Sequence, residues 1–257
     1  MQTAEGYYYT DTLGETSTDP VLLIHGVGGS HLSWPTSIRK IEGRRVICMD
    51  LPGHGASTGS ACQSVAAYAR SIESLLRVVR IYRAIFVGYS LGGQVALHYS
   101  INHPDQCAGL GLIACSSSPA VPARLLELLN DPSAGAAAVE LIRSLMFAEN
   151  TPPHKVKQME KILFSARHGT MLADWRAFKE FHFPDLSAEF PDIPLWVCSA
   201  INDKLIPSRA ARILTHLHTD VTCAFIDHCG HGILAEQPEA VGLALVESLL
   251  TNKNSPG

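Results

Sequence analysis

Short runs rich in Val, Ile and Leu alternate along the chain with stretches in which apolar residues recur at helical spacing. The short runs are apolar at nearly every position, which is typical of strands covered on both faces in a parallel sheet. The alternation of the two signals therefore predicts an α/β fold with a mainly parallel central sheet flanked by helices. The predicted strands lie at residues 21–25, 46–50, 84–88, 108–114, 195–199 and 222–226.

Three further segments have the hydrophobic periodicity of helices. Apolar side chains recur every three or four positions from Val65 to Val79, which predicts a helix with one face on the sheet. Residues 91–101 and 239–250 also favour helices. Pro238 stands near the first turn of the last of these, where its missing N–H leaves no helical hydrogen bond unmade.

The strand signals stop between residues 116 and 192. Four prolines, at positions 122, 132, 152 and 153, separate apolar-rich segments that each suit a short helix. We interpret residues 116–192 as a helical cap, inserted into an α/β core that consists of residues 1–115 and 193–257.

Composition narrows the class of protein. A chain of 257 residues with 46% hydrophobic and 17% charged residues has enough apolar surface for one large core. A net charge of −4 gives no reason to expect a nucleic-acid partner, and no apolar run approaches the roughly 20 residues of a membrane helix. The N-terminal residues lack the pattern of a secretory signal, and the seven cysteines contain no CxxC pair, so we expect a cytoplasmic protein with buried, reduced thiols.

The most specific motif is Gly88-Tyr89-Ser90-Leu91-Gly92, which fits the pattern G-x-S-x-G. It stands where a predicted strand ends and a predicted helix begins. A serine at such a sharp turn is presented above the sheet, and the crowded turn requires small residues two positions before and after it. Short Gly-Ser patterns also occur in ordinary turns, but the flanking elements favour a nucleophile.

Serine is a weak nucleophile at neutral pH and needs a base, which in turn needs an acid to orient it. Asp203 follows the fifth predicted strand, so it is expected at the carboxyl edge of the sheet, and His231 lies in a Gly-His-Gly loop before the last helix. The chain order Ser90, Asp203, His231 is the order of the α/β-hydrolase triad. The competing residues are Asp227 and His228, and Asp203 could also be an ordinary turn residue.

A second glycine-rich segment, His25-Gly26-Val27-Gly28-Gly29, follows the first predicted strand. We expect it to form half of an oxyanion hole, in which the backbone N–H groups of Val27 and Leu91 stabilise a tetrahedral oxyanion. The spacing does not fit a phosphate-binding loop. The histidines include no HExxH or comparable pair, so no metal site is expected.

These motifs resemble the α/β-hydrolase superfamily over nearly the full chain. Residues 171–183 also resemble the last cap helix of small capped carboxylesterases, enol-lactonases and pimeloyl-carrier methyl esterases. The resemblance implies that Asp50 and His54 support the neighbouring loop without a chemical role. One departure is Ser199-Ala200-Ile201, where relatives usually have a glycine. The matching segments are His25-Gly26, Asp50 to Gly55, Gly88 to Gly93, Asp203 to Pro207, Gly230-His231 and Glu236-Gln237-Pro238.

The motifs predict a serine hydrolase that cleaves a carboxylic ester, or a lactone or thioester, through an acyl-enzyme on Ser90 without a cofactor. Dehalogenases and epoxide hydrolases of the superfamily have Asp at this position, and carbon–carbon bond hydrolases often have Trp where Gly232 stands. Two alternatives use the same residues. One is a small-molecule receptor with slow turnover, and the other is an acyltransferase or perhydrolase.

The cap sequence suggests a small-molecule substrate with a largely apolar acyl group. Most apolar cap residues are expected to pack the cap onto the core, and a minority to face the substrate. Basic residues between positions 154 and 167 would suit an acidic carrier protein, although such charges usually form a solvated face. The pattern leaves the oligomeric state open. The candidate pocket residues are Leu125, Leu145, Met146, Phe164, Trp175 and Phe178.

Overall fold

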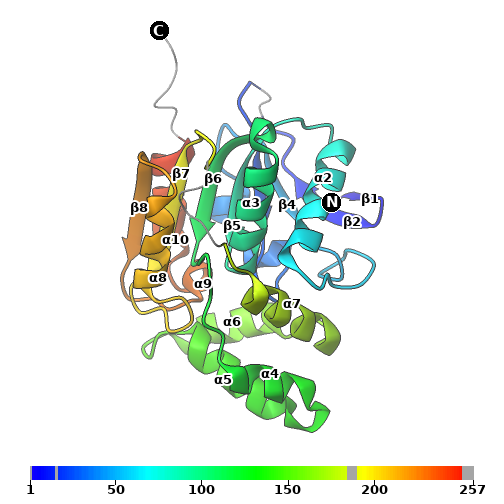
Figure 1. Ribbon diagram of the computed structural model, residues 1–257, viewed down its shortest axis with the longest axis vertical. Helices are drawn as coiled ribbons and strands as arrows, with labels where there is room; N and C mark the ends of the chain where they lie inside the picture. Colours follow the sequence, from blue (N-terminus) through cyan, green and yellow to red (C-terminus); the bar gives the residue numbers. More distant parts are fainter. Residues whose placement is uncertain (1, 15–16, 184–189, 251–257) are drawn as a thin grey trace.

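The computed structural model describes residues 2–14, 17–183 and 190–250, and its centre is a single sheet flanked by helices (Figure 1). In the described residues the sheet has eight strands in the order β1-β2-β4-β3-β5-β6-β7-β8. β1 pairs antiparallel with β2 and β2 antiparallel with β4, whereas all other neighbours are parallel. The strands are β1 (Gln2–Ala4), β2 (Tyr7–Asp11), β3 (Val21–Ile24), β4 (Val46–Met49), β5 (Ala84–Tyr89), β6 (Cys107–Ile113), β7 (Leu195–Ala200) and β8 (Val221–Ile226).

The prediction of a mainly parallel α/β sheet is confirmed, and all six predicted strands lie within one residue of their expected bounds. The hairpin of β1 and β2 was not predicted. β2 has the sequence Tyr-Tyr-Tyr-Thr-Asp and is mostly half-buried, because it is paired near the margin of the sheet and is not covered on both faces. Cys223 corrects the expectation of buried thiols: it lies on the edge strand β8 and is exposed.

Two hydrophobic clusters cover the two faces of the sheet. Alternate residues of β3 point to opposite sides, so Leu22 and Ile24 join one cluster and Val21 and Leu23 the other. Helices α2 (Val65–Val78), α3 (Leu91–Asn102) and α8 (Ser208–Ile213) contribute to the first cluster. Helices α1 (Thr36–Arg39) and α10 (Pro238–Leu245) contribute to the second. Burial on both sides explains why the central strands are continuously apolar in sequence.

The final predicted helix changes its geometry before its end. It begins at Pro238 as α10 and continues from Val246 to Leu250 as a π-helical turn, η5. The remaining short helices are η1 (His31–Ser33), η2 (Pro104–Gln106), η3 (Pro132–Ala134), η4 (Leu214–His216) and α9 (Ile233–Glu236). Within the described ranges, none of the helices is both long enough and apolar enough to cross a membrane.

Between β6 and β7 the described residues form four α-helices, which we call the cap helices: α4 (Ala123–Asn130), α5 (Gly135–Met146), α6 (Pro153–Leu163) and α7 (His168–Glu180). They lie together beyond one end of the sheet, at the bottom of Figure 1, with α7 nearest to α3. The four short helices expected from the sequence are therefore present. Residues 184–189, at the end of the predicted cap, lie outside the described residues.

Candidate active site

Ser90 lies at the turn between β5 and α3. Its backbone has φ 55° and ψ −118°, a strained conformation that few non-glycine residues adopt. Its N–H donates to the carbonyl of Ile113 on the neighbouring strand at 2.9 Å, which helps to hold the strained turn. The side chain is thereby presented at the carboxyl end of the sheet, with only 3% of the residue exposed.

Two glycines make this turn possible. A Cβ atom on Gly88 would lie 2.1 Å from the carbonyl oxygen of Gly92, and a Cβ atom on Gly92 would lie 2.1 Å from the carbonyl oxygen of Ile24. Both obstacles are backbone atoms, which cannot move aside as a flexible side chain can. The glycines at these two positions of the sequence motif are therefore a steric requirement of the turn.

The structure brings Ser90, His231 and Asp203 into a continuous series of hydrogen bonds. His231 Nε2 lies 2.9 Å from Ser90 Oγ, and His231 Nδ1 lies 2.8 Å from Asp203 Oδ2. Since a carboxylate only accepts, Nδ1 of a neutral His231 carries the proton and Nε2 is free to accept the serine proton. All three residues are buried, at 3%, 1% and 5% exposure respectively.

Asp203 lies directly after β7, at the edge of the sheet predicted from the sequence. Its Oδ1 accepts the N–H groups of Leu205 at 2.9 Å and Ile206 at 2.7 Å, so Oδ2 faces His231. The competing residues Asp227 and His228 are exposed and contact each other instead. The glycine that relatives usually carry before the acidic residue is not needed, because no residue from Ser199 to Asp203 has a positive φ.

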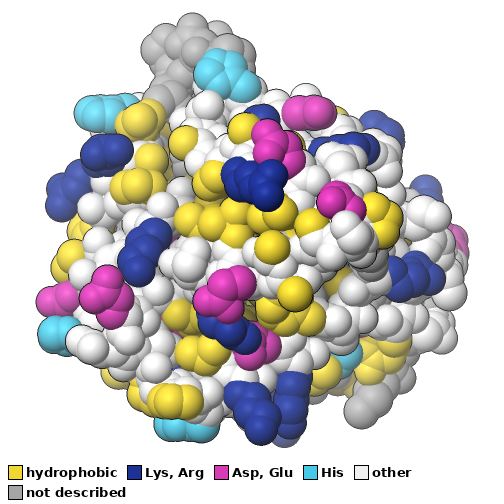
Figure 2. All heavy atoms as spheres, turned by 90° about the horizontal axis from the view of Figure 1, so that it is seen from below, with side chains coloured by type: hydrophobic (Ala, Val, Ile, Leu, Met, Phe, Trp, Pro, Cys, Tyr) yellow, Lys and Arg dark blue, Asp and Glu magenta, His cyan; other side chains and the backbone are white. Residues whose placement is uncertain are grey.

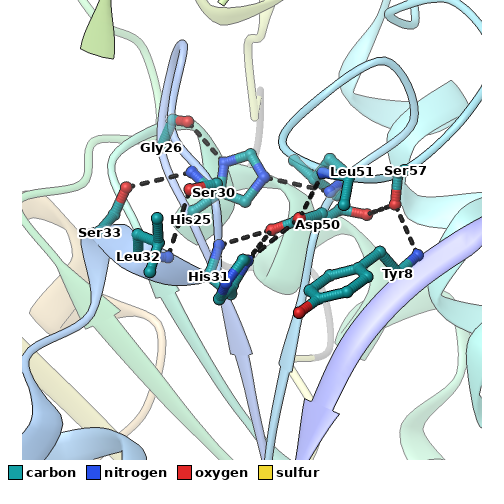
Figure 3. A network of polar contacts seen from close by, with 11 residues as sticks. Tyr8, His25, Gly26, Ser30, His31, Leu32, Ser33, Asp50, Leu51 and Ser57 are labelled. Carbon is teal, nitrogen blue, oxygen red and sulfur yellow. Dashed lines mark hydrogen bonds and ion pairs between the residues drawn. The ribbon is translucent and has the colours of Figure 1, made fainter. Parts of the chain in front are cut away.

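The loop after β3 is held on the core by a network of polar contacts (Figure 3). His25 donates from Nδ1 to the Gly26 carbonyl at 2.8 Å and accepts the Leu51 N–H at Nε2, at 3.0 Å. These partners define a neutral imidazole. Burial, followed by repulsion from His54, lowers the pKa of His25 to about 4, in agreement with that assignment.

Asp50 fixes the other side of the same loop. Its Oδ1 accepts the backbone N–H of His31 at 2.5 Å and contacts the His31 ring at 2.9 Å, and its Oδ2 accepts the N–H of Ala56. Although burial of Asp50 opposes its charge, the hydrogen bonds from His31 and Ala56 dominate and lower its pKa. This arrangement agrees with a supporting role for Asp50.

Two backbone amides adjoin the serine turn: Leu91 follows Ser90 at the start of α3, and Val27 follows Gly26 in the loop after β3. Gly26 is so close that a Cβ atom on it would lie 3.0 Å from Ser90 Cβ. Leu91 is the first residue of α3, so its N–H has no acceptor within the helix, and no described residue accepts from the N–H of Val27. These are the two amides that the sequence analysis assigned to the oxyanion.

The sequence analysis assigned no role to two residues that hold the loop of His231. The hydroxyl of Tyr89 donates to the His231 carbonyl at 2.8 Å, and its ring lies 5.6 Å from the imidazole centre. Glu236, 4% exposed, accepts the N–H groups of Gly230 at 2.9 Å and Ala148 at 3.1 Å. For Tyr89, the sequence offered only its position as a large aromatic residue before the nucleophile. For Glu236, it offered an acidic residue at the end of the apolar segment that begins at Ile233.

The candidate pocket residues differ in burial. Four of them are buried in the cluster that joins the cap helices to the core, and Leu145 and Phe164 are half-buried against it. This arrangement fits the expectation that most apolar cap residues pack the cap onto the core. The four buried residues are Leu125, Met146, Trp175 and Phe178.

The end of the molecule seen from below carries Lys and Arg side chains spread among acidic and hydrophobic ones (Figure 2). Two basic residues of the 154–167 segment already have partners in the core. Lys155 donates to the Glu236 carbonyl at 2.6 Å, and Arg167 donates to the Gly59 carbonyl at 3.1 Å. An acidic carrier as partner stays a prediction.

In the described part of the chain, no three His, Cys, Asp or Glu side chains are grouped as metal ligands.

Residues 21–242 match the alpha/beta hydrolase family, a range that includes the serine turn, both loops and the cap helices. The chain belongs to this family.

Proteins with similar sequences or structures include hydrolases and esterases. A protein of Variovorax paradoxus, provisionally named carbamate hydrolase RutD, is 27% identical over 95% of this chain and 96% of its own. The enol-lactonase from Burkholderia xenovorans LB400 has a similar structure, with a TM-score of 0.85 at 17% identity and 96% coverage of both chains. A thermophilic esterase from Thermogutta terrifontis gives a TM-score of 0.81 at 24% identity, covering 94% of this chain and 92% of its own. The two solved structures show that this chain shares their fold.

Proposed function

We propose that the protein is a serine hydrolase that cleaves carboxylic esters of small, largely apolar acids through an acyl-enzyme on Ser90. The observation that carries the proposal is the unbroken hydrogen-bond series from Ser90 Oγ through His231 to Asp203. In this series Asp203 faces His231 Nδ1, and His231 Nε2 faces the Ser90 hydroxyl, which is the arrangement that nucleophilic catalysis by serine requires.

In the acylation step, Ser90 Oγ attacks the ester carbonyl carbon while His231 Nε2 takes the hydroxyl proton. The negative charge that develops on the carbonyl oxygen is stabilised by the N–H groups of Val27 and Leu91, each worth about 10²–10³ in rate for a donor of this kind. Collapse of the tetrahedral intermediate breaks the ester bond, and His231 gives the proton to the departing alkoxide. Asp203 stabilises the imidazolium throughout by accepting from Nδ1.

In the second step, water replaces the alcohol. His231 removes a proton from the water, which attacks the acyl carbon and forms a second tetrahedral intermediate at the same two amides. Release of the carboxylic acid regenerates Ser90 with its proton. The reaction is complete with the side chains named here.

Burial supports a neutral acyl group. The buried polar side chains of the described residues include no Lys or Arg that could pair with a charged acyl group next to Ser90. The cap helices contribute apolar side chains, among them Leu125, Met146 and Phe178, to the hydrophobic cluster that they share with the core. A lactone or thioester with the same apolar character would fit the same chemistry.

The test uses a fluorophosphonate probe followed by nitrophenyl esters of increasing acyl length. We expect labelling of the purified wild type, its loss in Ser90→Ala, sustained multiple turnover and a preference for short to medium acyl chains. Turnover that persists in Ser90→Ala would refute the assignment of the nucleophile. A single slow turnover that accompanies partner binding would favour a receptor, and diversion of the acyl group to added alcohol or peroxide would favour acyl transfer or perhydrolysis.

A further inference from the structure

Asp174 of cap helix α7 is a carboxylate with no exposed surface, and it is bound to three segments of the core. Its Oδ2 accepts the backbone N–H of Gly28 at 2.8 Å and contacts His54 Nε2 at 2.7 Å. Its Oδ1 accepts the hydroxyl of Tyr68 on α2. A buried carboxylate is costly unless its oxygens are hydrogen-bonded, and here both oxygens have donors.

The hydrogen-bond partners of His54 define the charges. His54 Nδ1 lies 3.0 Å from the carbonyl oxygen of Pro52, and Nε2 lies 2.7 Å from Asp174. Both neighbours are acceptors, so both ring nitrogens carry protons and His54 is a cation opposite an anionic Asp174. Burial opposes the charge on His54, but attraction and hydrogen bonding by Asp174 outweigh it and raise the pKa of His54.

Gly28 is the residue that connects this pair to the reaction. It directly follows Val27, whose N–H is one of the two proposed oxyanion donors. Gly28 has φ +62°, and a Cβ atom on it would lie 2.6 Å from Met171 Cε and 2.9 Å from the carbonyl oxygen of Leu163. Residues of the cap helices α6 and α7 therefore contact this turn directly. Its positive φ and the lack of space for a Cβ atom require a glycine.

The loop is thus fixed from two sides. The core holds its beginning through His25, and the cap holds its other end through Asp174 and the Gly28 N–H. We propose that Asp174 is a positioning residue for catalysis: by binding the Gly28 N–H from the cap, it fixes the direction of the Val27 N–H toward the oxyanion. This inference rests on the proposed function. It makes the complete oxyanion hole dependent on a docked α7.

The test compares Asp174→Ala, Asp174→Asn and Tyr68→Phe with the wild type. The readouts are kcat and KM on nitrophenyl butyrate, the inhibition constant of butylboronic acid, which forms a tetrahedral anion on the serine, and the melting temperature. Ala removes the acceptor of Gly28, whereas Asn keeps a weaker, uncharged one. Tyr68→Phe removes a hydrogen bond to Asp174 but leaves the bond to Gly28.

We expect Asp174→Ala to lower kcat by about 10- to 100-fold with KM changed less than about threefold, because a misplaced oxyanion donor affects the transition state and not substrate binding. The boronic acid should bind more weakly by a similar factor. In Asp174→Asn we expect an intermediate loss of kcat, of about 3- to 10-fold. In Tyr68→Phe, kcat should stay within about twofold of the wild-type value even if the melting temperature falls.

Several results would overturn the inference: unchanged kcat in both Asp174 variants, an effect on KM alone, or a loss in Tyr68→Phe equal to that in Asp174→Ala. If Asp174→Ala does not fold, Asp174→Asn carries the same comparison, since it preserves the shape of the side chain. A wild type without Ser90-dependent turnover would instead refute the proposed function. Normal wild-type turnover with unaffected Asp174 variants would refute this inference alone.

Discussion

Asp203 shows how the surroundings of one residue determine its chemistry. Its Oδ1 is occupied by two backbone N–H groups, from Leu205 and Ile206, so the side chain cannot rotate without leaving two buried donors unpaired. The remaining oxygen faces His231 and selects the imidazole with its proton on Nδ1. The partners of these two oxygens predict how replacing the carboxylate with an amide would change the protonation of His231.

In Asp203→Asn, the amide oxygen should stay on the two N–H groups and the NH₂ group should face His231 Nδ1. His231 would then have to accept at Nδ1 and carry its proton on Nε2, where it could no longer take the proton of Ser90. We expect kcat on a nitrophenyl ester to fall by about 10³–10⁴. The melting temperature should remain near that of the wild type, and a loss of less than tenfold would contradict the assigned role.

At the scale of elements, the cap helices hold both loops that flank Ser90. The Gly232 N–H donates to the Met146 carbonyl at the end of α5, at 2.6 Å, and a Cβ atom on Gly232 would meet the ring of Phe147 at 2.9 Å. Glu236 of α9 connects the His231 loop to the end of α5, because its oxygens accept from Gly230 in that loop and from Ala148 after α5. We call this contact the Glu236 junction. The cap is therefore part of the support of the histidine.

Glu236→Gln should loosen this junction. A glutamine offers one accepting oxygen and one donating NH₂ group, whereas both carboxylate oxygens of Glu236 face N–H donors. One buried donor would be left unpaired, at a cost of about 1–3 kcal/mol. We expect the melting temperature to fall by several degrees and kcat to decrease.

The matched control for this junction is Glu239→Gln, three residues further along the chain, where the side chain is exposed. It should melt and react like the wild type. Equal behaviour of the two variants in melting and turnover would show that Glu236 does not hold the loop.

At the scale of the whole molecule, the cap and the core are joined by a buried ion pair. Asp174 from α7 faces His54 from the core, and His54 is also faced by Asp50, by the neutral ring of His25 and by Tyr68. Because folding raises the pKa of His54 above its ordinary value of 6.5, the folded state binds this proton more tightly than the unfolded state. The resulting stability is fully present below pH 6.5 and is lost as the pH rises through the raised pKa of the folded state.

This linkage predicts that His54→Gln costs more stability at pH 6 than at pH 9. The melting temperatures of wild type and variant should therefore differ most at the acidic end and approach each other as the pH rises. In an Asp174→Asn background the pH dependence of that difference should shrink, since Asp174 supplies the attraction. Thermal melts at several pH values measure this difference in melting temperature. A difference between wild type and His54→Gln that does not change with pH would contradict the ion pair.

The sequence alone determined the α/β fold and the six central strands, and it predicted Ser90, Asp203 and His231 as the candidate catalytic residues. Local physics is sufficient for these features. Strands covered on both faces must be apolar throughout, the tight turn at Ser90 excludes side chains from Gly88 and Gly92, and the carboxyl ends of parallel strands meet at one edge. The partly exposed β1–β2 hairpin lacks the first of these signals and was missed.

Only the tertiary structure decided which side chains hold the reacting groups in place. Asp174 lies 146 positions from Gly28, and Tyr89 lies 142 positions from the His231 carbonyl that it binds. Many acidic and aromatic residues in the sequence could make such bonds, and spacing along the chain does not distinguish among them. The choice is made when α7 packs on the core, because burial removes water as the alternative partner and leaves each donor with the acceptor that the fold places beside it.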